Sequence, residues 1–156
     1  MNKFAILDYA SIQPIEAGEQ DIPRCILSLR GISTGKKLNG AVLEAVLSWN
    51  ENFIIFLTDD ILFENALHVY LLDADLDVLD SATLCSMYAT GIFDSLRLIE
   101  PNTVLFRFFG DADWSIEFQP KEVARVPYFF EPAGVTRPFG LYRRFIVRDE
   151  LPTSGA

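Results

Sequence analysis

Residues 65–80, which read NALHVYLLDADLDVLD, decide the fold. The stretch starts as an apolar run from Ala66 to Leu72, breaks at residues 73–75, and resumes as an alternating segment. A short β-branched and aromatic run that ends in aspartates is typical of a strand entering a turn. We therefore predict a hairpin here, with four carboxylates at or near one of its ends: Asp73, Asp75, Asp77 and Asp80.

Further strand signals recur at intervals of about 8–12 residues, as they do in all-β folds. Residues 41–49 (Ala41–Trp49) fit either a helix or a strand, and we favour a strand because Asn50-Glu51-Asn52 is typical of a hairpin turn. The other predicted strands cover residues 4–7, 24–29, 53–57, 92–99, 104–109, 114–118 and 141–148. Polar residues, glycines and prolines predict loops at residues 11–23, 33–40, 81–91 and 134–138.

Long amphipathic helices are missing from this pattern. We therefore predict a mainly β to α+β fold, built on an antiparallel β-sheet as a sandwich or partly open barrel with few short helices. Half of the 156 residues are apolar, which is enough to bury a core without disulfides. We expect a single globular domain over residues 1–150 and a frayed C-terminal tail over residues 151–156.

Charge and composition limit the classes of function that fit this chain. The formal charge is -9, and residues 1–80 hold 13 acidic but only 5 basic side chains. Such a chain is a poor nucleic-acid binder, because affinity for phosphates comes from lysine and arginine. Cys25 and Cys85 lie in apolar settings, which predicts buried, reduced thiols. No apolar run is long enough for a signal peptide or a membrane span, so we predict a cytosolic protein without membrane contact.

Known catalytic and metal-binding motifs do not fit. Asp73, Asp75 and Asp77 resemble the opening of a calcium loop, but Val78 and Leu84 occupy the positions that require glycine and glutamate. We therefore predict a solvated acidic turn that meets lysine or arginine of a partner, with no metal and no cofactor. Residues 31–36 have one residue too few between the glycines for a phosphate loop. His68 is the only histidine, and the sequence contains no nucleophile-elbow motif whose serine could pair with it in a catalytic triad. A core or surface role is therefore the simpler interpretation.

Two further acidic turns are candidate contact surfaces. One contains Asp59, Asp60 and Glu64, and the other contains Asp111 and Asp113 next to Trp114. An exposed Trp114 would suit an interface anchor, whereas its position in a strand favours the core. The C-terminal arginines are most simply explained as partners of the acidic half, within the fold or between protomers: Arg137, Arg143, Arg144 and Arg148.

Three segments, residues 56–73, 88–93 and 108–114, are similar to small bacterial immunity-type proteins encoded beside polymorphic or contact-dependent toxins. That resemblance implies a cytosolic, non-enzymatic protein that binds a toxin domain and occludes its active site. No catalytic residue carries over, because such families differ in fold. An acidic binder suits a basic nuclease toxin, whose substrate groove attracts polyanions.

We thus expect an acidic inhibitory protein whose partner is a basic protein, with the oligomeric state left open. The predicted contact residues are Asp73, Asp75, Asp77, Asp59, Asp60, Glu64, Asp111, Asp113 and Trp114. One alternative is a β-barrel that binds a small molecule, or a small hydrolase, which uses His68. It requires a large closed pocket that reaches this histidine. A further alternative is a structural subunit with a broad exposed apolar face.

Overall fold

The computed structural model of the chain describes residues 3–16, 22–61, 64–86, 91–110, 112–124, 131–138 and 140–150, so the predicted tail at residues 151–156 lies outside the described residues. The described residues form thirteen strands in three antiparallel sheets, without a closed barrel. This confirms the prediction of a β fold built on antiparallel sheets. The few short helices that we also expected do not occur in the described ranges.

The largest sheet has six strands and contains the predicted hairpin. Its strand order is β1 (Phe4–Ile6), β5 (Val42–Trp49), β6 (Asn52–Thr58), β7 (Ala66–Leu72), β8 (Val78–Cys85) and β12 (Val135–Thr136). β7 and β8 pair from Ala66 opposite Cys85 to Leu72 opposite Val78, so residues 65–80 fold as predicted. The ambiguous Ala41–Trp49 segment is a strand, and it turns at Asn50 and Glu51 into β6.

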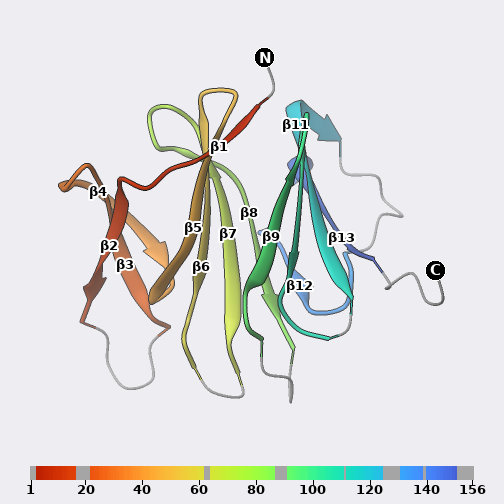
Figure 1. Cartoon of the computed structure of the whole chain (residues 1–156), viewed down its shortest axis with the longest axis horizontal. Helices are drawn as coiled ribbons and strands as arrows, with labels where there is room; N and C mark the ends of the chain where they lie inside the picture. The colour runs from red at the N-terminus through yellow and green to blue at the C-terminus, as the bar shows by residue number, and fades with distance from the viewer. Residues whose placement is uncertain are drawn as a thin grey trace.

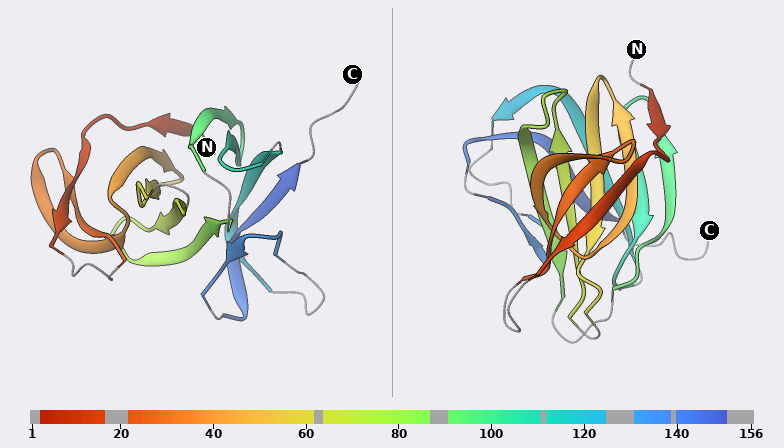
Figure 2. Two further views of the ribbon diagram at one scale, coloured as in Figure 1. Left: turned by 90° about the horizontal axis from the view of Figure 1, so that it is seen from below. Right: turned by 90° about the vertical axis from the view of Figure 1, so that its left-hand side faces the viewer.

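The two smaller sheets flank this central sheet. On one side lies a three-stranded sheet of β2 (Ala10–Ile15), β3 (Arg24–Leu29) and β4 (Ile32–Asn39). On the other side lies a four-stranded sheet ordered β13 (Tyr142–Glu150), β11 (Asp113–Ala124), β10 (Thr103–Arg107) and β9 (Asp94–Ile99). Figure 1 shows β5–β8 between the two flanking sheets, and Figure 2 shows how strongly the strands curl around one another.

The central sheet is buried on both faces, which explains its uninterrupted apolar runs. In β6, Ile54 and Phe56 point into the main core against the four-stranded sheet, while Ile55 and Leu57 point into a second core under the three-stranded sheet. A strand covered on both sides needs no polar alternation. The main core is rich in aromatic residues that include Trp49, Phe56, Phe106, Trp114, Phe118 and Phe145.

Several predicted loops are in fact strands. Residues 11–23, 33–40, 81–91 and 134–138 contribute β2, β4, most of β8 and β12. β2 and β4 form the edges of the small sheet and carry mostly exposed or half-buried side chains, so polar residues and Pro14 are tolerated there. In β8, Ala82 and Leu84 enter the main core, while Ser81 and Thr83, which alternate with them, lie outside it.

The two cysteines are free, as predicted. Cys25 is buried in the second core, and this burial raises its pKa to about 11. Cys85 is only half-buried. The prediction of a buried, reduced thiol is therefore confirmed for Cys25, whereas Cys85 is reduced but partly accessible.

Candidate functional site

The structure places two of the three predicted acidic sites at opposite ends of the central sheet. The 59–65 segment precedes β7 and the 73–77 turn follows it, so the seven residues of this strand separate them. At about 3.4 Å per residue the separation is about 24 Å. Figure 1 shows the two connections at opposite ends of β7. The 59–65 segment and the 73–77 turn therefore form two separate acidic surfaces.

The side chain of Asp73 stabilises the 73–77 turn. Its Oδ1 accepts hydrogen bonds from the backbone N–H groups of Asp75 (2.9 Å) and Asp77 (3.0 Å). The backbone N–H of Asp73 donates to the carbonyl of Asp77, and Leu76 closes the turn with a φ of 68°. Asp75 and Asp77 are exposed, and neither forms an ion pair with another described residue. The turn thus presents two free carboxylates on a fixed backbone.

Asp80, the fourth carboxylate of this stretch, is buried and serves the fold. Its Oδ2 accepts bonds from Arg137 Nη2 and from the backbone N–H of Arg144, both at 2.7 Å. The Arg137 guanidinium also lies 4.3 Å from the centre of the Phe145 ring. Burial lowers the pKa of Arg137, and Asp80 opposes this shift. Asp80 lies near the hairpin end as predicted, but it is buried, because its side chain faces inward from β8 and ties this strand to β13.

A hollow of about 320 Å³ adjoins the 73–77 turn. We call it the β8–β13 hollow, because it lies between the first residues of these strands. Its exposed apolar residues are Val78 (42 % exposed), Leu141 (69 %) and Tyr142 (57 %), and it also contains Arg143, Pro138 and Gly140. Large apolar side chains grouped at such exposure mark contact sites for other molecules.

Sequence reasoning missed this hollow. The sequence predicts a strand over residues 141–148 and places Val78 on the return strand of the hairpin, without indicating that the two meet. The available signal was the consecutive pair Leu141-Tyr142, because two large apolar side chains directly after Gly140 lie at the exposed start of a strand, where both remain exposed. The contact with Val78 depends on the fold, because these residues lie far apart in the chain.

At the opposite end, Asp59 is engaged internally. Its Oδ1 lies 2.8 Å from His68 Nε2, and His68 Nδ1 lies 3.2 Å from Thr83 Oγ1. A carboxylate only accepts hydrogen bonds, so Nε2–H donates to Asp59, and in a neutral imidazole Nδ1 is then the acceptor for the Thr83 hydroxyl. The order hydroxyl, imidazole and carboxylate matches that of a nucleophile, its base and an orienting group.

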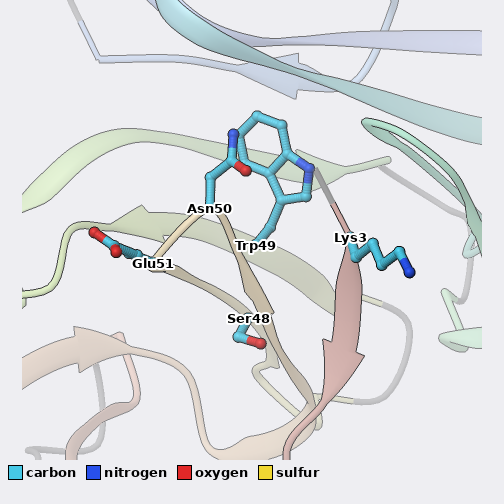
Figure 3. Close-up of a pocket in the computed structure, with 5 residues that line it drawn as sticks. All are labelled: Lys3, Ser48, Trp49, Asn50 and Glu51. Carbon is cyan, nitrogen blue, oxygen red and sulfur yellow. The ribbon is translucent and has the colours of Figure 1, made fainter. Parts of the chain in front are cut away.

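Two features nevertheless favour a structural role for this network. His68 is only 5 % exposed, and Thr83 lies within β8 between its partners on β7 and β12. In that position the backbone is engaged in the sheet and offers no spare N–H groups to hold an oxyanion. Neither the β8–β13 hollow nor the hollow of Figure 3 is lined by His68. The network fixes the start of the 59–65 segment, whose exposed acidic residues are Asp60 and Glu64.

At the third acidic site, Asp113 is paired within the fold and Trp114 is buried. Asp113 pairs with Arg97 at 3.1 Å and with Arg107 at 3.6 Å, so its charge is balanced within the four-stranded sheet. Trp114 is buried in the main core and packs edge-on against Phe109, with ring centres 5.0 Å apart. The core alternative for Trp114 is therefore confirmed, and the exposed anchor is wrong. Asp111 lies outside the described residues.

A second hollow, of about 500 Å³, lies at the β5–β6 turn and is lined by Lys3, Ser48, Trp49, Asn50 and Glu51. Figure 3 shows that the Lys3 and Glu51 side chains point away from each other. Trp49 belongs to the main core, and its Nε1 donates to the carbonyl of Pro101 at 2.7 Å. Because no polar groups converge in this hollow, it does not define a ligand site.

Within the described ranges, no three or more His, Cys, Asp or Glu residues are grouped so that they could hold a metal ion. The same part of the chain contains no helix of the length and hydropathy needed to cross a bilayer. No protein-family model, curated protein or solved structure matches the chain. Function must therefore be inferred from the residues themselves, and the 73–77 turn with its neighbouring hollow is the candidate site.

Proposed function

We propose that this chain is an acidic, non-enzymatic binding protein of the immunity type. It neutralises a basic toxin domain, such as a nuclease, in the cytosol by covering the active site of that domain. The observation that supports the proposal is the 73–77 turn, where Asp75 and Asp77 are exposed without ion-pair partners among the described residues. The turn leads directly into the apolar β8–β13 hollow.

The electrostatics of the chain suit this role. A formal charge of -9 attracts a basic protein over a long range and speeds the encounter. The Asp73 side chain holds the backbone of the turn before any partner arrives. A preformed turn loses little conformational entropy on binding, so more of the attraction between opposite charges appears as affinity. A nuclease groove is a suitable target because it is itself built to attract polyanions.

A hydrolase that uses His68 is the competing function. The specific observation in its favour is the hydrogen-bonded order of Asp59, His68 and Thr83. We prefer binding because the histidine is buried, because the strand backbone around Thr83 leaves no donors for an oxyanion, and because the two free carboxylates have no role in such a reaction.

The test is to identify the partner and to measure its association rate. The tagged chain is used to capture proteins from its source cell, the captured protein is identified by mass spectrometry, and the pair is then studied in purified form. In low salt, the double variant Asp75→Lys and Asp77→Lys should associate at least about tenfold more slowly than the wild type. The difference should shrink in high salt, where exposed charges are screened.

The matched control is the double variant Asp60→Lys and Glu64→Lys, which makes the same change in net charge at the other end of β7. It should slow association much less. Equal slowing by both variants would mean that only the net charge matters, and no slowing by either would remove the 73–77 turn from the interface. An acidic partner would overturn the proposed function.

A further inference from the structure

The β8–β13 hollow is built differently from the acidic turn beside it, because its charged side chains, Asp80 and Arg143, are already engaged within the fold. The carboxylate of Asp80 accepts bonds from Arg137, from the Arg144 backbone and from the Ser81 backbone. The Arg143 guanidinium donates to the carbonyls of Tyr142 and Pro138. What the hollow offers a ligand is therefore the exposed apolar surface of Val78, Leu141 and Tyr142.

We propose that the hollow receives one large aliphatic or aromatic side chain of the partner, and that this side chain is flanked by lysine or arginine. This inference rests on the proposed function. The apolar walls select an uncharged side chain, and the free carboxylates of Asp75 and Asp77 on the adjoining turn select cations beside it. Tyrosine is a frequent centre of binding energy in interfaces, and Tyr142 supplies such a residue at the rim.

The position of the hollow in the fold favours an anchor site. Its β8 side and its β13 side are joined by the buried bond between Asp80 and the Arg144 backbone, next to the Arg137 ion pair. This connection holds the two walls at a fixed separation, so an incoming side chain does not have to order them. The carboxylates would then guide the approach, while the hollow would slow dissociation.

A second copy of this chain is a poorer occupant. If two copies met through their hollows, their 73–77 turns would be brought together, and each carries two unpaired carboxylates. Each chain also has a formal charge of -9. Like charges that face each other across an interface disfavour the complex, whereas a basic partner gains from the same carboxylates.

The proposal can be tested with two capped tripeptides of equal charge, Lys-Trp-Lys and Lys-Gly-Lys, titrated into the isotope-labelled full chain and followed by NMR. Both should shift the amide signals of the 73–77 turn. Only Lys-Trp-Lys should shift those of Val78–Ser81 and Tyr142–Arg143, with an affinity about tenfold higher, as an added buried aromatic contact provides. The variant Tyr142→Ser should remove this difference, whereas Ile32→Ser, which removes an exposed side chain on β4, should leave it unchanged.

The possible results separate the two proposals. If both peptides shift the turn and neither shifts the hollow, the anchor site is wrong and the acidic docking surface stands. If neither peptide shifts the turn, the proposed function itself is contradicted. If the chain forms a dimer in sedimentation experiments and Tyr142→Ser abolishes it, the hollow belongs to a second copy and the anchor site is again wrong.

Discussion

The two acidic connections at the ends of β7 have similar sequences but use their carboxylates differently. In the 73–77 turn, Asp73 bonds to backbone N–H groups of its own turn. In the 59–65 segment, Asp59 bonds to a side chain, His68, while the Asn65 side chain accepts from the Asp60 backbone. One carboxylate therefore shapes a local turn, and the other joins a network that includes side chains of β7 and β8.

This difference shows that acidic residues close together in the sequence do not necessarily form one exposed acidic surface. Within a single stretch, Asp77 is exposed and Asp80 is buried, because β8 begins between them and turns Asp80 toward the inside. Among the described residues, only the carboxylates without a nearby backbone or side-chain donor keep an unpaired charge. The three predictions that follow compare engaged carboxylates with exposed neighbours, and the expected effect decreases from each to the next.

Replacing Asp80 should have the largest effect. Asp80→Asn removes the charge that faces the buried Arg137, and breaking a buried ion pair from one side costs about 3–5 kcal/mol of unfolding free energy. The measurement is urea unfolding. The matched variant Asp77→Asn should stay within about 0.5 kcal/mol of the wild type, as exposed sites do. A similar, small loss in both variants would mean that Asp80 is not a buried partner of Arg137.

Replacing Asp59 should have an intermediate effect. Asp59→Ala leaves His68 Nε2 buried without an acceptor, which should cost about 1–3 kcal/mol of unfolding free energy. Urea unfolding again provides the comparison, with Glu64→Ala as the exposed control in the same segment. Equal stability of the two variants would contradict a structural role for the network and would strengthen the hydrolase alternative.

Replacing Asp73 should have the smallest effect of the three. Asp73→Ala removes two hydrogen bonds to backbone N–H groups at an exposed turn and should cost about 1 kcal/mol. Asp73→Asn should be close to the wild type, because its amide oxygen accepts the same bonds. Thermal unfolding of both variants is the measurement. If Asp73→Asn is as unstable as Asp73→Ala, the charge of Asp73 matters more than its hydrogen bonds.

Local sequence signals predicted the framework of the molecule well. Residues 24–29 and the hairpin around the 73–77 turn have the expected conformation, since apolar runs and turn residues act over a few neighbouring positions. β4 was missed because Gly35, Lys36 and Lys37 are typical of a loop, although an edge strand with an exposed face accepts them. β8 was partly missed because Ser81 and Thr83, which alternate with its buried residues, interrupt the apolar pattern.

The candidate site was predicted only in part. The exposed carboxylates Asp75 and Asp77 could be inferred from their turn. Burial of Asp80 depends on Arg137, which lies 57 residues further along the chain, and the hollow depends on a similarly distant contact. Charge patterns along the sequence do not reveal such pairs, because several arginines were equally plausible partners for several aspartates.

The buried bonds of Asp80 also bear on how the protein is made. Its partners Arg137, Arg144 and Phe145 follow it by 57, 64 and 65 residues. During translation the first four strands of the central sheet are complete long before these residues leave the ribosome. Until then Arg137 is not available to pair with Asp80, so Asp80 cannot be buried as an ion pair. Packing next to β8 therefore has to follow the synthesis of Arg137 and β13.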